Sequence, residues 1–409
     1  MTRPFTPRDA LRLRQEQAAG TALELETTVL VSQSPLRQAV TSLLRVGASG
    51  VRTYVLSLPD GAGGFLQARK RAHAPEADTT FIAPALSARD GAALYWSRMI
   101  GESCQHLAAE GIQRVFVAVD ENDRVALQLF QQVGFRVFAG DTVFQRAPAP
   151  SSGRLEMPVS SNPAHPNPAR PDPALRIRPA IDADAPAITA CHRASLPPRV
   201  RAEEWGSERG APVASNANST AGSNSASGER AGSEGGQDAC WGHYPVGGHG
   251  ADGRAAWVGI GERGVVLCAA RCVFGRKGDW LQIVSVDEVD FAPLVRYVLD
   301  QVRGEGGAGS GQPPDGAAPG AGLAGQRQGI ARGLVSGRPL YATARGYESQ
   351  LNLVLRDCGF RPVVGRFRMV KHTAVRILEP SWSTQLVAES SLETVPMNTA
   401  PTQFHSSTR

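Results

Sequence analysis

The alternation of apolar and polar positions divides the chain into folded blocks and stretches that cannot fold. Two blocks have the periodicities of strands and helices, whereas the segments between and after them are rich in Pro, Gly, Ser and Ala and hold few large apolar residues. We therefore expect the following organisation: domain 1 over 1–146, an extended Pro-rich linker over 147–175, domain 2 over 176–376 with disordered insertions at about 202–253 and 304–335, and a disordered tail over 377–409.

The first block mixes strand and helix patterns in a definite order. Residues 51–58 and 64–72 have strand character and flank a PDGAGG turn, which indicates a hairpin. The pattern of residues 79–85 predicts a third strand. Residues 91–111 predict a long helix with Gly111 as its C-terminal cap. A buried strand, VFVAV, a helix and a final strand follow. The order predicts an α+β fold with an antiparallel front and one parallel crossover.

The second block repeats this order and shares short anchors with the first. Near the start, Arg-Pro is followed at the same spacing by Asp-Ala in both blocks, and near the end a helix stops at Gly-Phe-Arg in both. The matching residues are Arg3-Pro4 with Asp9-Ala10, Arg178-Pro179 with Asp184-Ala185, Gly134-Phe135-Arg136, and Gly359-Phe360-Arg361. Two anchors in the same order predict an internal duplication.

Composition narrows the classes of protein. The 409 residues are 42% apolar, which suffices for two cores. Almost all of the 43 basic residues are scattered arginines, so the net charge of +5 does not indicate a nucleic-acid surface. Six cysteines are too sparse for a disulfide framework, and we find neither a signal peptide nor an apolar run that could span a membrane. We expect a cytoplasmic protein with reduced thiols.

The element order and the two anchors together resemble the GNAT superfamily of acyl-CoA-dependent N-acyltransferases. The resemblance covers both blocks and implies two tandem GNAT-like domains, each a mixed, mostly antiparallel sheet flanked by helices. It also implies acetyl-CoA or another acyl-CoA as co-substrate, and a small-molecule or peptide amine as acceptor. The acceptor itself has no signature in the sequence.

The family's cofactor turn joins the third central strand to the long helix. Its pattern is Gln or Arg, two residues, Gly, one residue, then Gly or Ala, and its backbone N–H groups approach the CoA diphosphate. In the first block the candidate cofactor-binding residues are Ala88, Arg89, Asp90, Gly91, Ala92 and Ala93. Gly91 and Ala93 fit, whereas Ala88 replaces Gln or Arg and Asp90 would repel a phosphate. The alternative is an ordinary helix start.

The matching turn of the second block has no glycine. It places Asp287, Glu288 and Asp290 at the start of the helix, where carboxylates stabilise the helix dipole but repel a diphosphate. We expect the second domain not to bind CoA.

Two further positions bear on catalysis. Family members often carry a tyrosine on the last helix, five residues before the Phe of Gly-Phe, which protonates the departing thiolate. Here these positions are Phe130 and Leu355, neither of which can donate a proton. Glu76 and Asp78 are the acids nearest to the third strand, so they are the candidates for a general base. The alternative is that both are solvated loop charges.

Other chemistry has weaker support. The spacing of Cys240, His243 and His249 fits no zinc pattern, and Cys268 and Cys272 share one strand face, as core residues do. Two hypotheses remain for function. The first is an N-acetyltransferase whose activity, if any, lies in domain 1; the second is a non-catalytic GNAT-fold binding or assembly module, with a regulatory CoA sensor as a third reading.

Overall fold

A computed structural model of the chain describes residues 1–30, 34–44, 50–57, 63–71, 74–88, 91–148, 175–205, 253–286, 289–303 and 338–373. Nearly all of the expected linker, most of both expected insertions and the whole expected tail lie outside these residues. One difference is visible at an edge, because residues 202–205, which we assigned to an insertion, continue a helix. No helix among the described residues is long and apolar enough to cross a membrane.

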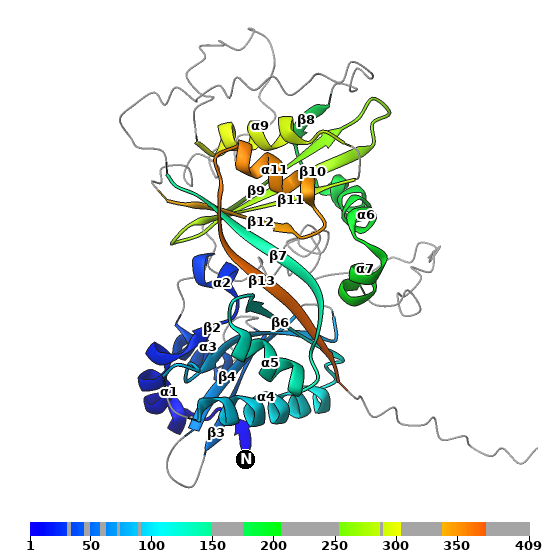
Figure 1. The fold of residues 1–409 in the computed structure, drawn as a ribbon. Helices are drawn as coiled ribbons and strands as arrows, with labels where there is room; N and C mark the ends of the chain where they lie inside the picture. Colours follow the sequence, from blue (N-terminus) through cyan, green and yellow to red (C-terminus); the bar gives the residue numbers. More distant parts are fainter. Residues whose placement is uncertain are drawn as a thin grey trace, which may run out of the picture. The chain divides into compact units, whose positions relative to one another are not determined.

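The first repeat, residues 1–146, contains the expected strands and helices together with short elements that the sequence did not predict (Figure 1). Its elements are β1 (Thr2–Pro4), α1 (Ala10–Glu16), β2 (Thr21–Ala22), α2 (Leu25–Leu30), α3 (Pro35–Leu43), β3 (Val51–Ser57), β4 (Gly63–Lys70), β5 (Glu76–Ala83), α4 (Ala92–Ala109), β6 (Arg114–Asp120), α5 (Arg124–Gln132) and β7 (Arg136–Arg146).

The second repeat, residues 176–373, follows the same order. Its elements are β8 (Arg176–Pro179), α6 (Ala185–Ser195), α7 (Pro198–Trp205), β9 (Gly253–Ile260), β10 (Val266–Phe274), β11 (Asp279–Ser285), α9 (Ala292–Arg303), β12 (Leu340–Arg345), α11 (Ser349–Asp357) and β13 (Arg361–His372). In both repeats antiparallel strands come first, and a helix then crosses to a parallel strand, β5 to β6 and β11 to β12. The expected tandem α+β fold is confirmed.

The anchors seen in the sequence have the same geometry in both repeats. The Arg3 guanidinium donates two hydrogen bonds of 2.7 Å to the Asp9 carboxylate, and Arg178 donates two of 2.7 Å to Asp184. Each carboxylate also accepts a backbone N–H three residues earlier, at 2.8 Å. The pair ties the first strand to the first helix in each repeat, which explains why these residues mark the duplication.

The two repeats are joined by an exchange of strands. The sheet order is β1-β3-β4-β5-β6-β13-β7-β12-β11-β10-β9-β8, so the last strand of the second repeat lies between β6 and β7 of the first. Likewise β7 lies between β12 and β13, and β7 and β13 run side by side in Figure 1. Residues 1–375 form one compact unit, so the expected division of domains at 146 and 176 stays a prediction.

A buried cluster of charges lies where the exchanged strands meet. Asp141 of β7 lies opposite Arg366 of β13 in the strand register. The two residues follow the phenylalanine of their own Gly-Phe anchor at the same spacing in sequence. Arg366 donates to Asp141 at 3.0 and 3.2 Å and, on its other side, to Glu26 of α2 at 2.8 and 3.0 Å. Arg368 approaches Asp141 at 3.8 Å. These pairs tie α2 to both exchanged strands.

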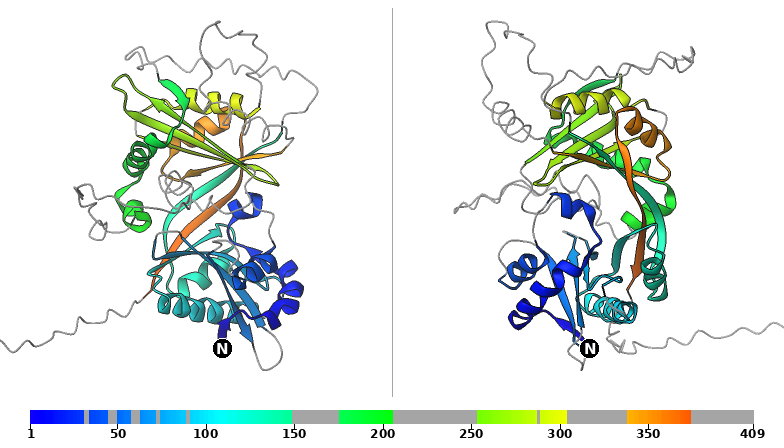
Figure 2. Two further views of the ribbon diagram at one scale, coloured as in Figure 1. Left: turned by 180° about the vertical axis from the view of Figure 1, so that it is seen from behind. Right: turned by 60° about the vertical axis from the view of Figure 1, so that its left-hand side comes forward.

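Helices cover both faces of the sheet in the first repeat (Figure 2). Tyr54 and Leu66 pack with Trp96 of α4 on one face, whereas Phe65 packs with Leu13 of α1 on the other. Because side chains alternate along a strand, Gln67 of β4 lies on the same face as Phe65, beside α3, where it is fully buried. Gln67 is thus a polar residue in a position that a core residue would normally occupy, and it lines the pocket described below.

Candidate functional site

The strands β5 and β6 diverge after a short stretch of pairing. They pair only from Glu76 to Asp78, although β5 extends to Ala83 and stays paired with β4 along that length. Along residues 79–83, the edge of β5 that faces β6 is therefore not paired with β6. The second repeat has the same feature, because β11 pairs with β12 only from Asp279 to Leu281. An edge of this kind can bond a ligand that carries amide groups.

In the first repeat this edge is taken by β2. Thr21 and Ala22 pair antiparallel with Ile82 and Phe81, and the Leu23 N–H donates to the Thr80 carbonyl at 2.9 Å. Because β4 bonds the same stretch from the other side, β2 must lie on the edge that faces β6. The approach is close: a Cβ on Gly20 would collide with the Phe81 ring. Sequence reasoning missed β2, since two residues carry no periodicity.

The expected cofactor turn follows β5. Gly91 has φ of 77° and begins α4, an 18-residue helix, and a Cβ there would meet nothing within 4 Å. Ala88 is exposed and Ala93 half-buried, whereas Ala92 is buried and offers a ligand only its backbone. Arg89 and Asp90 lie outside the described residues. Cofactor binding by 88–93 stays a prediction, with the open helix start at Gly91 in its favour.

The two acids named as candidate bases are ion-paired at the point where β5 and β6 part. Arg71 contacts Glu76 at 2.7 Å and Asp78 at 2.6 Å, and Arg114 of β6 also pairs with Glu76. The interpretation of Glu76 and Asp78 as solvated loop charges is wrong, because both belong to β5 and are 1% and 7% exposed. These ion pairs hold the two strands together where they part.

Their pKa shifts reflect this setting. Burial raises the pKa of Glu76 in spite of the two guanidiniums. Burial would also raise the pKa of Asp78, but the Arg71 guanidinium outweighs it and lowers that pKa. A general-base role for either stays a prediction, and both oxygens of Asp78 are already bonded to Arg71.

The positions where the family often has a tyrosine lie in the core. Phe130 is 0% exposed and packs edge-to-face with Trp96 and Phe135, at centroid distances of 6.2 and 5.1 Å. Leu355 is also 0% exposed. Both helices end alike, because Phe135 and Phe360 donate their N–H to the carbonyls of Phe130 and Leu355 at 2.9 and 3.0 Å. Neither position supplies an acid.

The remaining sequence hypotheses concern the second repeat. Asp290 caps the start of α9, accepting the Ala292 N–H at 3.0 Å, whereas Asp287 and Glu288 lie outside the described residues, as do Cys240, His243 and His249. Cys268 and Cys272 are fully buried core residues, as expected. No cluster able to hold a metal occurs among the described residues. The lack of CoA binding by this repeat stays a prediction.

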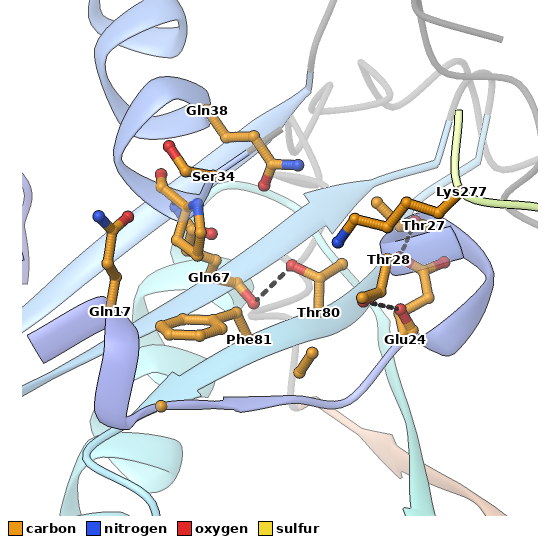
Figure 3. A pocket seen from close by; sticks show the side chains of 13 residues that line it. Gln17, Glu24, Thr27, Thr28, Ser34, Gln38, Gln67, Thr80, Phe81 and Lys277 are labelled. Atoms are coloured by element: carbon orange, nitrogen blue, oxygen red, sulfur yellow. Dashed lines mark hydrogen bonds between the residues drawn. The ribbon is translucent and has the colours of Figure 1, made fainter. Parts of the chain in front are cut away.

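A pocket of about 390 Å³ lies on the α1–α3 face of the first repeat (Figure 3). Most of the residues that line it have polar side chains, and one of them, Lys277, comes from the turn between β10 and β11 of the second repeat. The lining residues are Gln17, Gly20, Ala22, Glu24, Thr27, Thr28, Ser34, Pro35, Gln38, Gln67, Thr80, Phe81 and Lys277. The pocket thus borders both β2 and the divergent half of β5.

Glu24 is the acid of this pocket, and sequence reasoning did not find it. Its carboxylate pairs with Arg69 and accepts a 2.7 Å hydrogen bond from Thr27. Burial raises the pKa of Glu24 to about 7, against the opposing effect of Arg69. A carboxyl with such a pKa can give or take a proton near neutral pH. The sequence did contain one signal for this polar site: alternation along β4 places Gln67 and Arg69, the partner of Glu24, on the same strand face as the core residue Phe65.

No protein-family model and no curated protein matches the sequence. Among solved structures, a GCN5-related N-acetyltransferase from Sphaerobacter thermophilus is similar over 91% of this chain and 95% of its own, with 12% identity and a TM-score of 0.41. A tandem GNAT protein from the clavulanic acid biosynthesis pathway is similar over 91% and 98%, with 12% identity and a TM-score of 0.45. An acetyltransferase of the GNAT family from Colwellia psychrerythraea is similar over 91% and 99%, with 8% identity and a TM-score of 0.38.

Proposed function

We propose that this chain is an acyl-CoA-dependent N-acyltransferase whose first repeat holds the donor along β5 when β2 withdraws from it. The observation that carries the proposal is the divergence of β5 from β6 after Asp78. That divergence leaves a strand edge of 79–83 that β2 can bond, and the amides of a pantetheine arm have the same bonding groups as a strand.

The diphosphate of the donor would lie at the start of α4. Gly91 carries no side chain, the space around it is open, and the first turn of the helix contains no acid. The partial positive charge of an 18-residue helix favours an anion there. The second repeat has three acids before its helix, Asp287, Glu288 and Asp290, whereas α4 is preceded by Asp90 alone, which favours the first repeat as the donor site.

The chemical step is attack of a neutral amine on the thioester carbonyl. A backbone N–H in the divergent half of β5 would polarise that carbonyl, the C–N bond forms, and the C–S bond breaks. The amine's proton passes to Glu24, the titratable group of the adjoining pocket, and the thiolate takes a proton from water. A thiolate can leave without a proton donor, so the apolar Phe130 does not forbid the step.

A second candidate function is a non-catalytic binding module, and the seated β2 favours it. The hydrogen bonds of β2 to β5 stabilise the closed edge by roughly 2 kcal/mol, taking a few bonds at about 1 kcal/mol each. A donor that displaces β2 must overcome this free energy, which corresponds to an affinity lower by roughly 30-fold.

The two candidates separate on acetyl-CoA binding, measured by titration calorimetry on the full chain. Gly20→Ala places a methyl against Phe81 and should unseat β2, so we expect acetyl-CoA to bind up to about 30-fold more tightly than to the wild type. Gly91→Glu should abolish binding. Gly111→Glu is the matched control, because Gly111 has a similar φ of 84° and equally open surroundings at the other end of α4.

If neither the wild type nor Gly20→Ala binds acetyl-CoA at millimolar concentration, the acyltransferase proposal is wrong and the binding module stands. If Gly91→Glu and Gly111→Glu weaken binding equally, the start of α4 is not the diphosphate site. Transfer itself is checked by thiol release from acetyl-CoA in the presence of an amine.

A further inference from the structure

Two of the residues that line the pocket beside β2, Gln17 and Gln67, each carry an amide oxygen without a hydrogen-bond partner. Gln67 is 0% exposed, and its Nε2 donates to the Pro35 carbonyl at 2.8 Å and to the Thr53 hydroxyl at 3.0 Å. Because a carbonyl only accepts, the amide nitrogen must face Pro35, and the Gln67 oxygen is left unbonded. The Gln17 Oε1 is likewise buried and unbonded. Buried acceptors without partners call for a donor.

The pocket also has an uncompensated positive charge. Glu24 is neutralised by Arg69, and among the described residues no carboxylate pairs with the Lys277 ammonium. In Figure 3 the Lys277 side chain extends over the pocket from the turn above α2. An anionic group on a ligand would find its counter-charge there.

Backbone hydrogen bonds to α2 fix the position of the turn that carries Lys277. Lys277 and Arg276 donate their N–H groups to the carbonyls of Val29 and Leu30, both at 3.2 Å, at the end of α2. A Cβ on Gly275 would lie 2.5 Å from the Leu30 Cα, so only glycine permits this approach. The second repeat therefore delivers its lysine to a pocket built by the first.

We propose that this pocket binds a free amino acid, with its amine donating to the Gln17 and Gln67 oxygens and its carboxylate at Lys277. The volume of about 390 Å³ suits a molecule of that size. The assignment deepens the proposed function, on which it rests for the amine's role as acyl acceptor. Binding itself requires no acyl-CoA.

The test is titration calorimetry of the full chain with the twenty common amino acids, in the absence of acyl-CoA. For the amino acid that binds most tightly, the amine left by removing its carboxylate and the acid left by removing its amine serve as matched probes. We expect each probe to bind at least tenfold more weakly than the amino acid. The assignment is overturned if no amino acid binds at 10 mM or if the amine binds as tightly.

Two variants of one exposed turn then locate the carboxylate. Lys277→Met should weaken amino-acid binding about tenfold and leave the amine probe unchanged. Arg276→Met removes the neighbouring charge, which does not line the pocket, and should have no effect. Equal losses in both variants would refute a specific site at Lys277. Amino-acid binding without acyl transfer would refute the proposed function and leave this assignment intact.

Discussion

Glu26 offers the sharpest test of what holds the two repeats together. Burial alone would raise the pKa of its carboxyl, but the Arg366 guanidinium overrides burial and lowers that pKa from 4.5 to about 2. Glu26 is 1% exposed, so solvent screens this pair little. At 1.36 kcal/mol per pKa unit, the ionised carboxylate stabilises the fold by about 3 kcal/mol at neutral pH.

The sign follows from the depressed pKa. The stabilisation is complete above 4.5, the ordinary pKa of the carboxyl, and is lost as pH falls toward about 2. Glu26→Gln should therefore lower the free energy of unfolding by about 3 kcal/mol at pH 7, but by only about 1 kcal/mol at pH 3. Arg366 keeps Asp141 as a partner in the variant.

The assay is equilibrium urea unfolding at pH 7 and pH 3, followed by tryptophan fluorescence. Glu262→Gln is the control, because Glu262 is exposed in the turn between β9 and β10 and should leave stability unchanged at both pH values. A loss in Glu26→Gln that is the same at pH 7 and pH 3 would refute the electrostatic reasoning and point to altered packing.

Two further substitutions have definite expected results. Arg71→Met leaves Glu76 and Asp78 buried without their shared partner and should cost about 3–5 kcal/mol in urea unfolding at pH 7. A loss below about 1 kcal/mol would show that Arg114 at Glu76, with Arg69 and Arg368 near Asp78, suffices. Gly275→Ala forces the lysine-bearing turn away from α2 and should cost about 1–3 kcal/mol, again by urea unfolding, whereas an unchanged midpoint would mean that the turn can shift freely.

Local signals in the sequence predicted most elements of the fold. The strands of the hairpin alternate as a half-buried sheet requires, and Gly111 and Gly134 end their helices with the positive φ that glycine allows. The shared Arg-Asp pairs identified the duplication because each pair is formed within a few residues. Contacts between residues that are close in the chain produce local patterns, so they can be predicted from a single sequence.

The features that decide the site are of long range. Arg114 of β6 pairs with Glu76 of β5 across 38 residues of sequence, and no local pattern separates such a pair from solvated charges. The insertion of β13 beside β6 joins residues far apart in the chain, and β2 is too short to show a period. Sequence reasoning therefore found the divergent strand and the turn at Gly91, but neither the strand that closes the edge nor the pocket beside it.

The strand exchange sets an order of events during synthesis. The position between β6 and β7 is filled by residues 361–372, so the amino-terminal half cannot complete its sheet until nearly the whole described chain has left the ribosome. Until then two strand edges stay open to wrong partners. A fragment that stops at residue 146 should accordingly aggregate, and supplying the rest of the chain in trans should rescue it.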